Sequence, residues 1–210
     1  MPLIAFVGNK GGAGKTTLTV NVSSGLARDS RVIVVDADPQ GSSLQWRAFS
    51  SDEATVPVIE ASEHLEEQAK ALLEQYDYVV IDCPPSVHAI QTTTALAFCD
   101  TALVPVQPSP VDLWATVHIE EAVSNARETN SRLKAYLIIN QLEPRTTLSK
   151  LVRDALSEIS LPVAETALRR RAIYRSSALE GKSVFHMGSR GRDAVTELEQ
   201  LIQEVVTNEY

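Results

Sequence analysis

The sequence is poor in cysteine and in aromatic residues, and it has no long apolar run. The two cysteines, Cys83 and Cys99, are too few for a disulfide framework or a four-thiolate metal site, so we expect small buried residues in a reducing cytoplasm. No run approaches the roughly 18 apolar residues of a transmembrane helix. The first residues lack the basic segment of a signal peptide. We therefore expect neither a membrane span nor export.

The overall composition is that of a globular chain. Of 210 residues, 44% are hydrophobic and 22% are charged, with 9 glycines and 10 prolines. These values exclude a disordered, collagen-like or coiled-coil chain and allow a sizeable core. The length fits one domain.

Apolar runs alternate with helical patterns along the chain. Because these runs lack polar alternation, they predict strands that are covered on both faces. The predicted strands are 3–7, 31–36, 56–59, 78–82, 101–106 and 134–140, and the predicted helices are 16–28, 62–75, 112–129, 148–159, 172–180 and 193–206. This order predicts a single doubly wound α/β domain over residues 1–210, with a mostly parallel sheet and helices on both faces.

A glycine-rich loop follows the first predicted strand and opens the first helix. It reads Lys10-Gly11-Gly12-Ala13-Gly14-Lys15-Thr16-Thr17, and Asn9 stands where the general phosphate-loop pattern has its first glycine. Glycines let backbone N–H groups turn toward phosphate oxygens, and the helix start adds its positive dipole end. Lys15 can neutralise phosphate charge, and the Thr16 hydroxyl can bind Mg²⁺. The alternative is a strand–helix turn that binds no ligand.

This loop resembles the deviant Walker A box of the ParA/MinD superfamily of ATPases. Residues 36–41, D-A-D-P-Q-G, resemble that family's first switch, and residues 79–85, V-V-I-D-C-P-P, resemble its Walker B strand and second switch. With residues 106–109 and the C-terminal region, the resemblance covers nearly the whole chain, whose length is similar to that of the small ParA-type partition ATPases. The resemblance implies a P-loop NTPase fold, ATP and Mg²⁺ as cofactors, and hydrolysis of ATP to ADP and phosphate.

The resemblance also implies different roles for the two lysines of the loop. Lys15 acts on the nucleotide of its own subunit, whereas Lys10 crosses a dimer interface to the partner's nucleotide, like an arginine finger supplied in trans. ATP with Mg²⁺ then drives formation of a homodimer. The alternative for Lys10 is a solvated loop lysine.

Three acidic residues are implied to complete the catalytic centre. Thr16 and Asp82 hold Mg²⁺, with Asp82 acting through water. Asp36 is a partner of the metal or of Lys15, and Asp38 orients the attacking water. Taken alone, Asp36 and Asp38 also fit a strand-end cap and a turn.

The base is implied to bind at the end of the sixth strand. Asn140 ends that strand and reads the adenine, with the Pro108 segment beside it. The alternative for Asn140 is a residue that only terminates the strand in a turn.

The charge of the chain is unevenly distributed. The net charge is −8, yet residues 169–192 carry seven basic residues against Glu180 alone, a local charge of +6. A basic segment on an acidic body indicates a phosphate-rich partner, although a solvated charged face is the simpler alternative. The segment's basic residues are Arg169, Arg170, Arg171, Arg175, Lys182, Arg190 and Arg192.

We interpret the chain as a cytoplasmic, nucleoid-associated ParA-type ATPase. Its ATP-bound dimer binds DNA without sequence preference, and a ParB-like or adaptor protein stimulates hydrolysis. The cargo is a plasmid, a chromosome, or an assembly such as a carboxysome or receptor cluster. The alternatives are a MinD-like membrane-placed regulator and an amidoligase- or dethiobiotin-synthase-like enzyme. The acidic segment 193–210, which has no lysine and no arginine, opposes membrane attachment.

Overall fold

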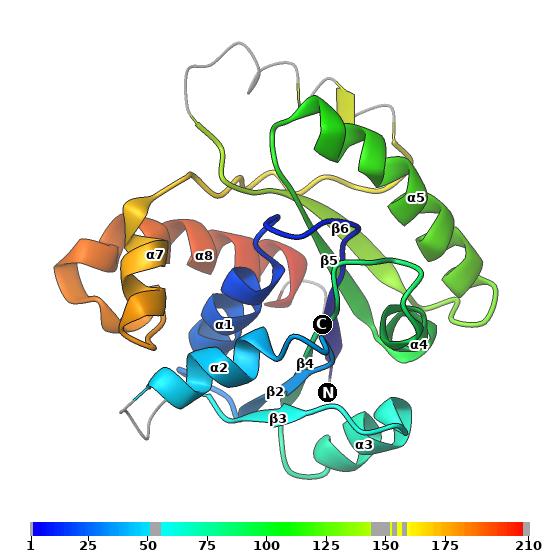
Figure 1. The fold of residues 1–210 in the computed structure, drawn as a ribbon, viewed down its shortest axis with the longest axis horizontal. Helices are drawn as coiled ribbons and strands as arrows, with labels where there is room; N and C mark the ends of the chain where they lie inside the picture. Colours follow the sequence, from blue (N-terminus) through cyan, green and yellow to red (C-terminus); the bar gives the residue numbers. More distant parts are fainter. Residues whose placement is uncertain (1, 51–55, 144–151, 153–154, 157–158, 208–210) are drawn as a thin grey trace.

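The fold is built on one parallel sheet with helices on both faces (Figure 1). The structure, a computed structural model, describes residues 2–50, 56–143, 152, 155–156 and 159–207. Its six strands lie in the order β3-β2-β4-β1-β5-β6, and every pair is parallel. The predicted α/β class is therefore confirmed. The strands are β1 Leu3–Phe6, β2 Val32–Asp36, β3 Val58–Glu60, β4 Tyr78–Asp82, β5 Thr101–Val106 and β6 Lys134–Ile139.

Two hydrophobic layers sandwich the sheet. Alternate residues of β1 divide between them, because successive side chains of a strand point to opposite faces: Leu3 and Ala5 enter one layer, and Ile4 and Phe6 enter the other. The first layer is covered by α3, α4 and α5, and the second by α1 and α8. The helices are α1 Lys15–Leu26, α2 Ser42–Phe49, α3 Leu65–Leu72, α4 Ile90–Phe98, α5 Pro110–Arg127, α7 Ala172–Leu179 and α8 Arg192–Val205.

The sequence-based prediction missed two helices and misplaced the start of others. The α4 sequence contains three consecutive threonines, whose branched side chains lower helix propensity, and α2 is short. Helix α5 begins at Pro110, earlier than predicted, because the Ser109 side chain caps it and proline fits its first turn. Helix α3 spans only part of the predicted 62–75. The predicted helix 148–159 falls largely outside the described residues.

Both cysteines are buried, as predicted. Cys83 and Cys99 have no exposed surface, and burial raises the pKa of each thiol above its ordinary value. No helix in the described ranges is long and apolar enough to cross a bilayer.

The docking of α8 supplies a stability test. Leu198 is fully buried in the layer that α8 shares with α1. We expect Leu198→Ala to lower the free energy of unfolding by about 2–5 kcal/mol, because it leaves a cavity. Gln203→Ala, on the exposed side of α8, should change it by less than about 0.5 kcal/mol. Urea unfolding measures both, and equal effects would show that α8 does not contribute to the core.

Candidate functional site

The glycine-rich loop lies between the end of β1 and the start of α1. Gly12 and Gly14 both adopt left-handed backbone angles, with φ of 82° and 99°. Gly14 is the residue that precedes α1, and its carbonyl accepts the N–H of Leu18 at 2.9 Å, which closes the first helical turn. The conformation therefore needs glycine at these two positions, and it places the loop directly on a helix N-terminus.

Lys15 turns back across this loop. Its side chain is only 7% exposed, and its Nζ donates to the carbonyl oxygen of Lys10 at 3.2 Å. Burial lowers the pKa of Lys15, while the carboxylates of Asp82 and Asp38 act in the opposite direction. The Lys15 ammonium therefore lies against the loop, where it can neutralise the charge of a bound phosphate.

Asp82 ends β4 beneath the loop and is completely buried. Ser43 donates to its Oδ2 at 2.6 Å, and Thr19 donates to its Oδ1 at 3.2 Å. Burial raises the pKa of Asp82 to about 6, although hydrogen bonds from Ser43 and Thr16 oppose that rise. Thr16 and Asp82, two of the residues predicted to hold Mg²⁺, therefore lie together.

Asp36 and Asp38 form the turn that connects β2 to α2. Asp36 Oδ1 accepts the N–H of Asp38 at 3.1 Å, and its Oδ2 accepts the N–H of Leu44 at 2.9 Å, in the first turn of α2. Asp38 Oδ1 accepts the N–H of Gln40 at 3.0 Å. These bonds form the strand-end cap and turn that the two aspartates also fit when they are taken alone. Burial raises the pKa of Asp36. The roles of both carboxylates toward metal and water stay predictions.

Asn140 supports the loop from the end of β6. Its Nδ2 donates to the carbonyl of Ala13 at 2.8 Å, and its Oδ1 accepts the N–H of Gln141 at 2.9 Å. Gln141, at a φ of 57°, in turn donates to the carbonyl of Gly12 at 3.1 Å. The side-chain amide of Asn140 is thus used to hold the loop, and its adenine contact stays a prediction.

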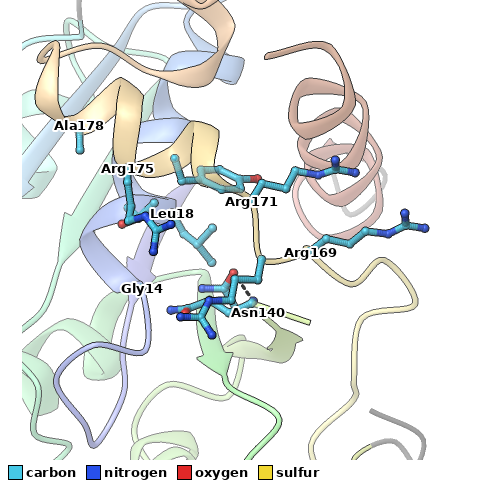
Figure 2. Close-up of a pocket in the computed structure, with 11 residues that line it drawn as sticks. Gly14, Leu18, Asn140, Arg169, Arg171, Arg175 and Ala178 are labelled. Carbon is cyan, nitrogen blue, oxygen red and sulfur yellow. Dashed lines mark hydrogen bonds between the residues drawn. The ribbon is translucent and has the colours of Figure 1, made fainter. Parts of the chain in front are cut away.

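A cavity of about 290 Å³ opens beside the loop (Figure 2). Asn140 lines it, and among the described residues Pro108 does not. The hydroxyl of Tyr174 is buried and has no hydrogen-bond partner among the described residues. An oxygen that is enclosed in this way is not available to a ligand in the cavity. The lining residues are Gly14, Thr17, Leu18, Asn140, Gln141, Arg169, Arg170, Arg171, Tyr174, Arg175 and Ala178.

Most of the basic segment is paired with acidic residues, contrary to the charge count along the sequence. Arg171 binds Glu197 at 2.7 Å and Asp193 at 3.0 Å, and Figure 2 shows the Arg169 and Arg171 side chains extended toward α8. The remaining pairs are Arg169–Glu197, Arg170–Glu143, Lys182–Glu180 and Arg190–Glu180. Arg175 and Arg192 make no ion pair with any residue that the structure describes. The seven cations are therefore not one free basic patch.

Lys10 is also paired within its own chain. Its Nζ lies 2.9 Å from Oδ2 of Asp112, at the start of α5. Sequence analysis missed Asp112, Ser43 and Thr19. The pattern Ser109-Pro110-Val111-Asp112 was the available signal for Asp112, since it is a helix-start sequence.

The contact between Gly14 and Asn140 supplies a test of the loop. A Cβ at Gly14 would lie 2.3 Å from Asn140 Nδ2, and the φ of 99° disfavours any other residue. We expect Gly14→Ala to lower the free energy of unfolding by roughly 1–3 kcal/mol. Gly11→Ala is the matched control, because its Cβ would meet nothing within 4 Å. Thermal or urea unfolding compares the two, and equal stabilities would contradict the close packing.

Comparison with known proteins places this site in a family. The CobQ/CobB/MinD/ParA nucleotide binding domain matches residues 4–184. The chain is 44% identical over 207 residues to "Maintenance of carboxysome distribution protein A" of Halothiobacillus neapolitanus, covering 97% of this chain and 95% of that protein.

Two solved structures share the fold. The ATP complex of a Cyanothece McdA variant has a TM-score of 0.76 at 16% identity, covering 97% of this chain and 96% of that one. The septum site-determining protein MinD of Pyrococcus horikoshii, complexed with Mg-ADP, has a TM-score of 0.71 at 20% identity, covering 100% and 98%. Because the family model matches most of the chain, and the parallel sheet and glycine-rich loop agree with it, the chain belongs to the CobQ/CobB/MinD/ParA family of nucleotide-binding domains.

Proposed function

We propose that the protein is a ParA-type ATPase that positions carboxysomes, and that it works as an ATP-dependent homodimer with a partner protein. The observation that carries the proposal is the loop around Lys15, with Thr16 and Asp82 beside it. The Halothiobacillus relative, which aligns over nearly the whole chain, favours carboxysomes over plasmids or chromosomes as the cargo.

The residues of the site fit a nucleotide with Mg²⁺. Space is open beside Gly11 and Gly12, so phosphate oxygens can approach the backbone there. The adjoining cavity, which Gly14, Asn140 and Tyr174 line, lies where the remainder of the nucleotide can bind. Thr16 and Asp82 would hold Mg²⁺, which draws charge from the phosphate oxygens when bound. These features support ATP and Mg²⁺ as the cofactors.

The chain's own groups have separable roles in hydrolysis. Lys15 neutralises phosphate charge in its own subunit, and Asp38, anchored in the turn before α2, orients the attacking water. Lys10 acts on the nucleotide of the second subunit and so makes hydrolysis depend on dimerisation. The partner protein stimulates hydrolysis at the resulting interface, and the dimer separates afterwards.

For DNA, we propose that the ATP-bound dimer uses the basic residues at the N-terminal end of α8, Arg190 and Arg192. Arg192 begins α8, carries no ion pair among the described residues, and lines a second cavity, whose other arginine, Arg28, is paired with Glu199. Arg190 is exposed in the turn before it, and its bond to Glu180 is long at 3.4 Å. Exposed pairs of this kind contribute little, so phosphate can replace the acid. Arg171, held by two acids, is the poorer candidate.

The two lysines can be separated experimentally. We expect Lys15→Ala to lose binding of MgATP, because the loop then has no ammonium group for the phosphates. Lys10→Ala should bind MgATP but stay monomeric and inactive, because its role is in trans. Calorimetry measures binding, and light scattering measures size. A Lys10→Ala protein that dimerises and hydrolyses ATP normally would contradict the role in trans.

DNA binding can be tested through its dependence on salt. Each phosphate contact that is lost should lower the slope of log K against log salt by about 0.9. We expect this reduction for Arg192→Ala and Arg190→Ala in the presence of MgATP, equally on two unrelated duplexes. Arg171→Ala, the comparison variant, should chiefly lower stability. Fluorescence anisotropy over a salt series gives the slopes, and unchanged slopes for Arg190→Ala and Arg192→Ala would show that the basic residues form a solvated surface.

A further inference from the structure

Two bonds fix Lys10 on its own subunit. Its carbonyl oxygen accepts from Lys15 Nζ at 3.2 Å, and its own Nζ donates to Asp112 Oδ2 at 2.9 Å. The Lys15 ammonium has three N–H donors, so it can keep the first bond while the other two serve a phosphate. The second bond, to Asp112, does not involve the phosphate-binding groups.

The pair between Lys10 and Asp112 is unequal in burial. The side chain of Lys10 is 44% exposed, whereas that of Asp112 is 5% exposed. A contact with one buried partner is screened less by water than a surface ion pair. The Lys10 ammonium is therefore restrained by Asp112 and still open to solvent on one side.

Asp112 has a side-chain hydrogen-bond partner besides Lys10. It is the third residue of the 18-residue helix α5, where the helix dipole favours a carboxylate. The Ser109 hydroxyl donates to its Oδ2, and its N–H donates to Ser109 Oγ at 3.2 Å. When Lys10 leaves, the carboxylate keeps the bond from the Ser109 hydroxyl and its place at the start of α5, so the bond to Lys10 can open without stranding a buried charge.

We propose that Asp112 is a positioning residue that holds Lys10 in cis and thereby raises the protein concentration needed for ATP-dependent dimerisation. This inference rests on the proposed function, in which Lys10 acts in trans. A second copy has to draw Lys10 away from Asp112 before the ammonium can reach the other subunit's nucleotide. Docking of the second copy therefore releases the Lys10 side chain.

The test replaces the Asp112 carboxylate with its amide. Asp112→Asn keeps the shape and an oxygen acceptor at the start of α5, but it removes the charge that holds Lys10. With MgATP, we expect half-maximal dimerisation at about tenfold lower protein concentration, the effect of one charge-assisted hydrogen bond. Sedimentation velocity over a concentration series measures it. Glu66→Gln, which breaks the exposed pair with Lys70 on α3, is the matched control and should match the wild type.

A double variant separates positioning from a structural effect. In a Lys10→Ala background, which should stay monomeric with MgATP, adding Asp112→Asn should leave the protein monomeric, because Asp112 acts only through Lys10. Dimerisation restored by the second substitution would overturn that role. If Asp112→Asn does not fold, Asp112→Ser, which also keeps an oxygen acceptor there, is measured in its place.

The outcomes separate this inference from the proposed function. If the wild type dimerises with MgATP and the Asp112 variant dimerises equally or less readily, the role of Asp112 is overturned and the proposed function stands. If the wild type stays monomeric with MgATP, the proposed dimer is overturned, and the role of Asp112 with it.

Discussion

The parallel register of the central strands is the constraint on which the site depends. In the register of the sheet, Asp36 of β2 lies beside Asp82 of β4, and Asp82 lies beside Phe6 of β1. Because parallel strands end at the same edge of a sheet, the loop after β1 and both carboxylates meet there. A slip of β4 by one residue would turn Asp82 to the other face of the sheet. The register therefore determines which charges surround Lys15.

Burial disfavours the charged forms of two neighbouring groups of opposite sign, Lys15 and Asp82. Desolvation lowers the pKa of Lys15 and raises that of Asp82, so the charged form of each is held at a cost in free energy. A phosphate beside Lys15 and a cation beside Asp82 both favour those charged forms. Ligand binding and ionisation are therefore linked, and the protein is best suited to take up anion and cation together.

The sequence alone predicts the parts of the structure that local chemistry determines. The strands follow from continuous apolar runs, and the loop around Lys15 follows from its glycines. The pairing of Arg171 with Glu197 joins residues on separate segments, so counting charges along the chain missed it. Asp112 was missed for the same reason, because only the folded chain brings it to Lys10. The use of Asn140 as a support for the loop likewise depends on β6 lying on the same side of β1 as β5.

The burial of both cysteines has a practical consequence for the study of this protein. Thiol reagents attack the exposed thiolate, and Cys83 and Cys99 are neither exposed nor readily ionised. The folded chain therefore resists alkylation and oxidation at its two cysteines. A single cysteine introduced on the surface becomes its one reactive thiol, so a fluorophore or cross-linker can be attached there without first removing the native pair.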